Sequence, residues 1–265
     1  MQQKNSLSGK AADPVVRRIT RADVVEALAA GTRDFQAAPR YGLVLGGLCA
    51  LIGLAVVATL FVAGLPYLAY PIAAGFVLVA PTLAAFLYEV SRRLGNNDTL
   101  AFGDVWRTVM GRKEVRWMGF MTIFVFVMWM YQVRLLMALF LGYSGMAATL
   151  EAFITTVLTT TPGLIFLLIG NVIGAVFSTV LFSLSVVSFP LVLDRDVDFV
   201  TAMITSVRAV ILNPGPMLVF GLIIAAALVL SVLTGFLGLV IAMPVLGHTT
   251  WHLYKRVVAP EVPAV

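Results

Sequence analysis

Residues 41–63 read YGLVLGGLCALIGLAVVATLFVA, a run of 23 residues without a charged side chain. A helix needs roughly 20 apolar residues to cross the hydrocarbon layer of a bilayer, and this run is long enough. Five similar apolar runs follow, with expected ranges of 68–90, 117–142, 163–193, 216–233 and 235–254. The sequence therefore predicts an all-α membrane protein with six transmembrane helices.

The composition of the chain agrees with this fold class. Of the 265 residues, 60% are hydrophobic and 12% are charged, and the mean hydropathy is +0.99. Soluble domains are about half apolar and about a quarter charged, so the excess apolar surface must face lipid. The single cysteine, Cys49, excludes an intramolecular disulfide. Residues 1–40 contain no apolar segment, and we expect no cleavable signal peptide.

The basic residues predict the orientation of the chain. All but one of the 18 Lys and Arg residues fall on one side of the predicted membrane, within residues 1–40, 91–116, 194–215 and 255–256. Lys and Arg accumulate in cytoplasmic loops, so we expect both termini in the cytoplasm. This distribution accounts for the net charge of +5, so a nucleic-acid partner is not needed to explain it. The sequence also lacks the zinc-finger spacing that would indicate such a partner.

Two alignments within the chain predict an internal repeat. The segment DVVEAL at 23–28 matches DFVTAM at 198–203, and Pro39 matches Pro214 at the same offset. A second alignment pairs Gly75, Pro81, Arg92 and Arg93 with Gly238, Pro244, Lys255 and Arg256. With a weaker copy that begins near Asp104, we expect three pseudo-repeats. Each would consist of a cytoplasmic amphipathic helix followed by a transmembrane hairpin.

The amphipathic helices allow two interpretations. They can lie flat at the membrane interface or cap the cytoplasmic end of the bundle. Asp23 and Asp198 are expected in their first turns, where a carboxylate favours the helix dipole. The expected domain organisation is a flexible cytoplasmic N-terminus at 1–18, a six-helix transmembrane domain at 19–257 and a short tail at 258–265.

Small and polar residues mark helix faces within the apolar runs. Gly42, Gly46 and Gly53 form a small-residue face that favours close packing, against this chain or against a partner. The fourth run carries a polar stripe. Its members are Asn171, Ser178 and Ser185. Such a stripe either hydrogen-bonds between helices or lines a path for a small solute.

Arg134 is the one cation predicted to lie inside a transmembrane helix. A charge at the centre of the bilayer costs roughly 3 kcal/mol, so such residues are usually paired or functional. Arg134 lies near the outer end of its helix, within reach of the interface, and Glu151 is the acidic residue on that side. We expect an anchoring role, by snorkelling or by pairing with Glu151, and keep a functional charge as the alternative.

His248 and His252 are the two histidines of the chain, one helical turn apart near the cytoplasmic end of the last run. This spacing makes them weak candidates for metal ligands, but no Glu follows His248 as in zinc proteases. We interpret them as interfacial residues and expect no bound metal. Glu89 precedes Arg92 and Arg93 by three and four residues, which predicts a local ion pair.

Several segments together are similar to a known family. They are RADVVEALAAGTRDF at 21–35, YPIAAGF at 70–76, YEVSRR at 88–93, FPLVLDRDVD at 189–198 and LGHTTWHLYK at 246–255. They resemble a proteobacterial family of integral membrane proteins of unknown function, over residues 17–256. The resemblance implies a Gram-negative inner membrane and brings no established activity.

Some members of that family carry the label cytochrome c oxidase subunit I. A haem–copper oxidase core holds its cofactors with more histidines than the two in this chain. The label therefore implies at most an association with a respiratory complex.

The sequence excludes several enzyme chemistries. It contains no P-loop, nucleophile elbow, CxxC pair or glycine-rich dinucleotide turn. We expect no catalytic residues and no cofactor, and interpret the chain as a non-enzymatic accessory, scaffold or assembly component. The expected partners are membrane lipids and another integral membrane protein or respiratory complex. The alternative is a small-solute transporter or channel.

Overall fold

The computed structural model describes residues 13–142 and 149–260, and most of them are helical. Three short helices each lead through an elbow into a long helix. These pairs are α1 (Arg21–Ala37) and α2 (Pro39–Val62), α4 (Phe102–Gly111) and α5 (Lys113–Phe140), and α10 (Phe199–Leu212) and α11 (Pro214–Leu233). The other elements are η1 (Pro66–Leu68), α3 (Ala69–Asn96), α7 (Leu150–Thr159), α8 (Thr161–Ser185), α9 (Ser188–Asp194) and α12 (Leu239–Val257).

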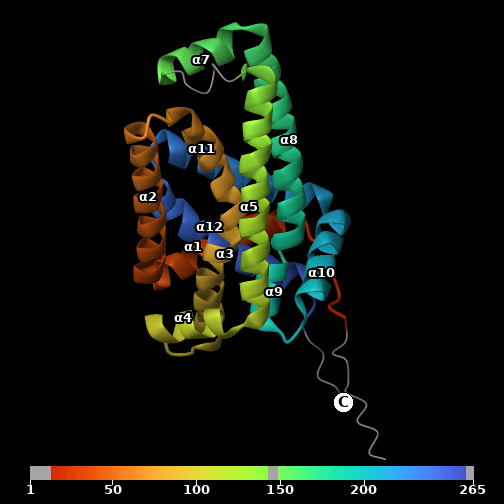
Figure 1. The fold of residues 1–265 in the computed structure, drawn as a ribbon. Coiled ribbons are helices and arrows are strands. Elements are labelled where there is room, and N and C mark those ends of the chain that lie inside the picture. Colours follow the sequence, from red (N-terminus) through yellow and green to blue (C-terminus); the bar gives the residue numbers. More distant parts are fainter. Residues whose placement is uncertain (1–12, 143–148, 261–265) are drawn as a thin grey trace, which may run out of the picture.

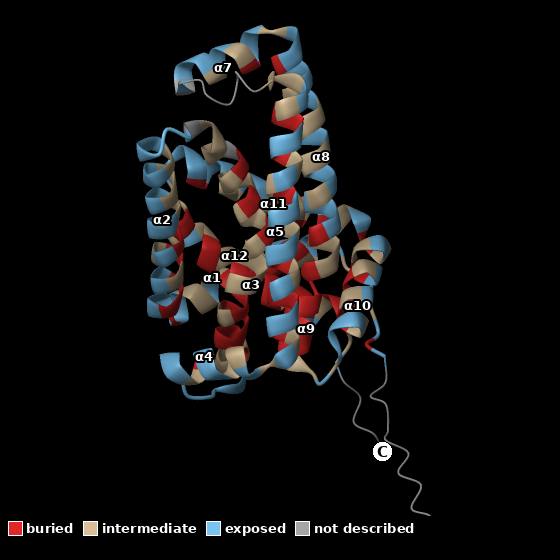
Figure 2. Cartoon of the chain, in the orientation of Figure 1, coloured by how far each residue is buried: buried red, intermediate tan, exposed pale blue. Residues whose placement is uncertain are grey.

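The long helices α2, α5 and α8 run roughly parallel, and α5 packs against α8 (Figure 1). We call the end of the bundle that carries α4 and α9 the basic end; α7 lies across the opposite end. Buried residues concentrate toward the basic end, around α3, α9 and α12, whereas α2, α5 and α8 present mostly exposed residues (Figure 2). This distribution fits helices whose outer surfaces face lipid.

Within the described residues, five helices are long and apolar enough to cross a membrane: Pro39–Val62, Pro71–Asn96, Lys113–Phe140, Thr161–Asp194 and Pro214–Leu233. These correspond to the first five expected runs, with ends shifted by a few residues. The sixth, expected at 235–254, is not among them: residues 234–238 form turns, α12 begins at Leu239, and the polar residues of its second half lower its mean hydropathy. The 19 residues of α12 extend about 28 Å at 1.5 Å per residue, and the half after Gly247 is largely polar.

The fourth expected helix, 163–193, is interrupted. α8 ends at Ser185 and α9 begins at Ser188. The amide of Val187 within the interruption donates to Oγ of Ser206 on α10, 3.0 Å away. A buried amide freed from a helix needs such an acceptor, so Ser206 stabilises the break.

The short helix α1 packs against α12 rather than lying free on the surface. Its buried residues are Val24, Ala27, Ala30 and Gly31. A Cβ at Gly31 would collide with the backbone of Thr249, so only glycine allows this close approach. Of the two interpretations of this helix, the structure favours the one in which it caps the bundle.

The start of α1 agrees with the sequence analysis in part. Thr20 and Asp23 form a reciprocal capping box, with Asp23 in the first turn. Asp198 is instead the N-cap of α10 and accepts hydrogen bonds from the amides of Val200 and Thr201. The hydrogen bonds at each helix start hold the pKa of Asp23 and of Asp198 below the ordinary value of 3.8.

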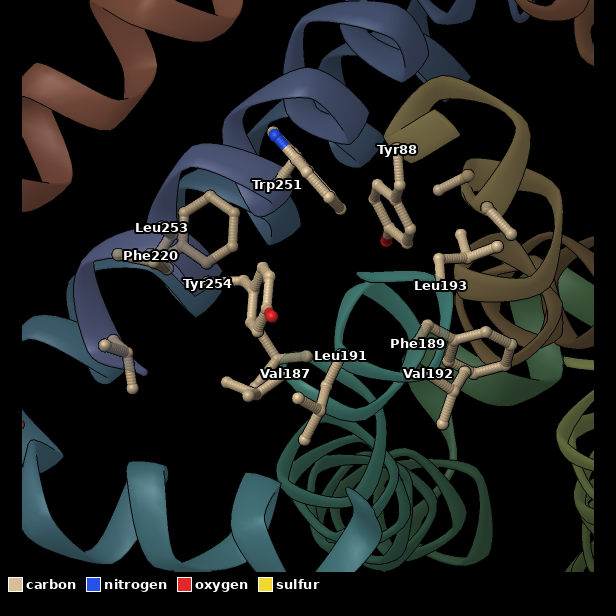
Figure 3. Packing of buried hydrophobic residues seen from close by; sticks show 14 of the residues in the cluster. Tyr88, Val187, Phe189, Leu191, Val192, Leu193, Phe220, Trp251, Leu253 and Tyr254 are labelled. Carbon is tan, nitrogen blue, oxygen red and sulfur yellow. The ribbon is translucent and has the colours of Figure 1, made fainter. Parts of the chain in front are cut away.

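The core at the basic end is aromatic and aliphatic. Trp251, Leu253 and Tyr254 of α12 pack with Tyr88 of α3 and with α9 (Figure 3). The residues of α9 in this cluster are Phe189, Leu191, Val192 and Leu193, each at most 1% exposed. α12 is therefore the central element of the fold, although its sequence is less apolar than that of the five spanning helices.

The expected flexible segment 1–18 lies largely outside the described residues. Its described part differs from the expectation, because Val16 forms an isolated bridge with Val258 and the amide of Arg17 donates to the carbonyl of Val257 at 2.7 Å. The side chain of Asn213 accepts from the amide of Ile19 at 2.7 Å and donates to the carbonyl of Arg17 at 3.0 Å. The segment before α1 is thus tied to both the C-terminal end and the elbow before α11.

The small-residue face of α2 packs within the chain. A Cβ at Gly42 would meet Pro244 and Phe35, and one at Gly46 would meet the backbone at Leu239 and Val240. This face therefore receives α12, and the structure supports the intramolecular interpretation.

Candidate functional site

A hydrogen-bonded group of polar side chains joins three helices near the basic end. Asp34 comes from α1, Ser91 from α3, and His248 and His252 from α12. Oδ2 of Asp34 lies 2.6 Å from Oγ of Ser91 and 2.7 Å from Nε2 of His252. Nδ1 of His248 lies 2.7 Å from Oγ of Ser91. We call these four residues the Asp34 network.

The positions of these residues follow from local structure. His248 and His252 lie one turn apart and so share a face of α12. The close contact at Gly31 brings α1 against that face, and Asp34 follows Gly31 by about one turn. Ser91 reaches the same point from α3, which also packs against α12.

The network runs from the interior toward solvent. His248 and Ser91 are buried, whereas the side chains of Asp34 and His252 are 17% and 28% exposed. Burial alone would raise the pKa of Asp34, but hydrogen bonds from His252 and Ser91 outweigh it and hold that pKa below 3.8. Asp34 is therefore ionised at neutral pH.

The network was only half anticipated from the sequence. The two histidines were singled out as a pair, but their partners Asp34 and Ser91 were not. No group of three or more His, Cys, Asp or Glu side chains in the described part of the chain is arranged to hold a metal ion. The two rings have different hydrogen-bond partners, Ser91 for His248 and Asp34 for His252, as described above.

The ion pair predicted at Glu89 is present. Its carboxylate is fully buried and accepts from Nε of Arg92 and Nε of Arg93, both at 2.7 Å. The guanidinium of Arg93 also donates hydrogen bonds to the carbonyl of Thr99 at 2.9 Å and to the hydroxyl of Thr108 at 3.1 Å. The pair thus anchors α4 to the end of α3.

Arg134 and Glu151 are both exposed, on α5 and α7 respectively. Among the described residues, the ion pairs do not include one between these two side chains. This geometry fits an arginine that snorkels rather than one that is paired. Whether it has a functional role stays open to experiment.

The polar stripe of α8 divides between two cavities. Asn171 and Ser178 line a cavity of about 360 Å³, which α3, α5, α8 and α11 enclose. Ser178 also lines a neighbouring cavity of about 110 Å³, where it is joined by the buried Ser185. Both walls are mainly apolar. Asn171 donates to the carbonyl of Leu167 on its own helix at 2.8 Å.

The larger cavity opens at its side. Asn171, Ala175, Ser178 and Ala225 are exposed although they line it. Small residues form much of its wall, and Gly170 has no neighbouring atom within 4 Å of the position a Cβ would take. The cavity is therefore an apolar cleft lined mainly by α3, α5 and α8, with Ala225 contributed by α11; we call it the lateral cleft.

Comparison with known proteins supports the membrane assignment. A family model described as "Predicted integral membrane protein (DUF2189)" matches residues 69–194. No curated protein and no solved structure matches the chain. The chain is thus similar to integral membrane proteins of unknown function, and its activity must be inferred from its own geometry.

Proposed function

We propose that this protein is a non-enzymatic accessory component of a bacterial inner membrane, which binds a transmembrane helix of another membrane protein in the lateral cleft. The basic end would face the cytoplasm, since Lys and Arg accumulate on that side. The observation that carries the proposal is the lateral cleft itself, which is open at its side and lined mainly by small and apolar residues.

Small residues at a membrane helix surface let a second backbone approach closely, and van der Waals packing then drives association. Gly170, Gly174 and Ala175 of α8 and Ala225 of α11 all line the lateral cleft. Only 6% of the residues in the apolar window of Thr161–Asp194 are buried, against 39% for Pro71–Asn96. α8 thus leaves most of its surface available to a neighbour in the membrane.

A photo-crosslinking amino acid at Ala225 tests the proposal in native membranes. We expect a discrete crosslinked protein, which mass spectrometry would identify, and a component of a respiratory complex would fit the family resemblance. Val176 provides the matched control, because it is an exposed residue of α8 that does not line the lateral cleft. The variant Gly170→Phe should abolish the crosslink by filling the cleft. Lipid adducts alone, or equal crosslinking from Val176, would contradict the proposal.

Transport of a small solute is the second candidate, because Asn171 and Ser178 both line the lateral cleft. Two polar side chains in a mainly apolar wall replace little of the hydration of a polar solute, so we rank this function lower. Flux through proteoliposomes that falls in Asn171→Leu and Ser178→Ala, with unchanged thermal stability, would reverse the ranking.

A further inference from the structure

The smaller of the two cavities beside α8 has an apolar wall and a polar inner end. Its volume is about 110 Å³, and its lining residues come from α3, α8, α11 and α12. We call it the inner cavity. Along α3 its lining runs from Phe76 to Tyr88, about 18 Å at 1.5 Å per residue. The hydroxyl-bearing residues Tyr88, Ser185 and Thr250 line it where their helices approach the basic end, and Figure 3 shows Tyr88 in the aromatic core there.

Ser185 is a buried hydroxyl that its own helix does not satisfy. A serine in a helix commonly donates to the carbonyl four residues earlier, and both Ser183 and Ser188 do so. Ser185, in contrast, is 2% exposed and makes no hydrogen bond within the described part of the chain. A buried hydroxyl without a partner is unfavourable, so its hydrogen is available to an acceptor that enters the inner cavity.

The inner cavity has an entrance from the membrane. Val77, Leu78 and Ser178 line both this cavity and the lateral cleft, which opens at its side. Exposure falls along the route between them, from the exposed Ser178 to the buried Ser185 and Thr250. A lipid-soluble molecule can therefore reach Ser185 from the bilayer.

The lining residues define the chemistry of such a molecule. Among the described residues that line the two cavities there is no acidic, basic or histidine side chain, so a charged head group would lose its hydration without compensation. A cavity of about 150 Å³ in another protein binds benzene, so the inner cavity, at about 110 Å³, is close to the size of one ring. Phe76, Phe182 and Tyr88 are aromatic lining residues against which a ring can pack. The hydroxyl of Ser185 requires an oxygen acceptor on that ring.

We propose that the inner cavity binds the head of a lipid-soluble quinone, a neutral ring with carbonyl oxygens and an apolar tail. One carbonyl oxygen accepts a hydrogen bond from Ser185, and the tail leaves past Ser178 into the lateral cleft. The head then points to the basic end and the tail to the bilayer interior, which is the orientation of a lipid in the leaflet on that side. The proposal concerns binding alone and goes beyond the partner helix proposed above.

Photoaffinity labelling of the full chain in lipid nanodiscs tests the proposal, with an azido-benzoquinone that carries a decyl tail as the probe. We expect saturable labelling within residues 76–88 and 178–185, located by mass spectrometry, and competition by excess decyl-benzoquinone. Decanol and decanoate should compete at least tenfold more weakly, because decanol lacks the ring and decanoate is charged. Labelling that does not saturate, or equal competition by decanol, would overturn the proposal.

Variants of the inner cavity test the role of Ser185. Ser185→Ala removes the donor and should weaken the apparent affinity for the probe about tenfold, whereas Ser185→Thr keeps the hydroxyl and should retain the affinity. Ser183→Ala is the matched control, because this hydroxyl donates to the carbonyl of Thr179 and does not line the inner cavity. Ala80→Phe should abolish saturable labelling, because its side chain fills the inner cavity.

The quinone site and the partner helix can fail separately. Neither Ala80 nor Ser185 lines the lateral cleft, so their variants should leave the crosslink at Ala225 unchanged. Loss of that crosslink with normal quinone labelling would contradict the partner helix alone. Melting temperatures establish that each variant folds, and if Ala80→Phe does not fold, Ser185→Ala and its control still decide. Equal labelling of Ser185→Ala and the unmodified protein, with equal melting temperatures, would refute the quinone site.

Discussion

Ala38 and Asn213 have nearly the same backbone conformation, with φ/ψ of −136°/55° and −127°/53°. Each is the residue between a short helix and a long one, and each precedes a proline that begins the long helix. The residue before a proline avoids the helical region, which explains why both elbows break there. The two positions also correspond in the internal alignment, so the elbows support the repeat that we infer from the sequence.

The first prediction concerns Asn213, which lies at the elbow between α10 and α11 and makes hydrogen bonds that Ala38 cannot make. Asn213→Ala removes three hydrogen bonds. The side chain of Asn213 accepts from the amide of Ile19 and donates to the carbonyls of Arg17 and Ala209. We expect a loss of about 2 kcal/mol in the free energy of unfolding, measured by denaturation in detergent. Asn213→Asp keeps the acceptor for Ile19 and should lose less. Equal stability of all three proteins would contradict this role.

The second prediction compares neighbouring glycines of α2. A side chain at Gly46 would collide with the backbone of α12, whereas Gly47 has nothing within 4 Å. Gly46→Leu should destabilise the protein by about 2 kcal/mol through overpacking. Gly47→Leu should have little effect, because its side chain extends into lipid or detergent. If both variants melted alike, the packing of α2 against α12 would be wrong.

The third prediction concerns Glu89, which is buried against two guanidinium groups. Glu89→Gln leaves two partly buried cations without a counter-charge, and we expect a loss of about 3 kcal/mol. Asp104→Asn is the control, because its pair with Arg107 is exposed, at 3.4 Å, and should contribute less than about 1 kcal/mol. Thermal unfolding of the two variants in one detergent gives the comparison. A Glu89→Gln variant as stable as Asp104→Asn would show that the pair is not required.

The structure also shows which features a sequence can reveal. The helix α2 follows from one apolar run, and the pairing of Glu89 with Arg92 and Arg93 follows from spacings of three and four residues. Both depend on contacts within a single helix. α12 was predicted as well, but it begins at Leu239 rather than at 235, because residues 234–238 form turns.

The Asp34 network depends on longer-range contacts. Ser91 meets a residue 57 positions earlier and another 157 positions later, and no periodicity predicts such a meeting. Only the packing of α1 and α3 on α12 brings these side chains together. The hydroxyl of Tyr254, which donates to Asp194 across 60 positions at 2.6 Å, is a second contact of this kind.

The fourth prediction tests the orientation. Cysteines introduced at Gly95 and Ala259, in a Cys49→Ala background, should resist an impermeant thiol reagent in intact cells. Gly95 is exposed and a side chain there meets no neighbouring atom, so burial would not explain its protection. A cysteine at Ser144, on the opposite side of the predicted membrane, should be labelled. Both protected positions should react after the membrane is permeabilised. Labelling at Gly95 in intact cells would reverse the orientation.

The fifth prediction separates two roles of Arg134. If the exposed guanidinium only snorkels to the interface, Arg134→Lys should be tolerated, because a flexible ammonium reaches the same water. A bidentate pair with Glu151 would instead make the Arg134→Lys variant measurably less stable, since lysine lacks the planar fork of the guanidinium. We expect Arg134→Gln and Glu151→Gln to lower the melting temperature additively, with a coupling energy below about 0.5 kcal/mol. A larger coupling would establish the pair. Loss of a solute flux in both variants, with unchanged stability, would make Arg134 a functional charge and favour the transporter.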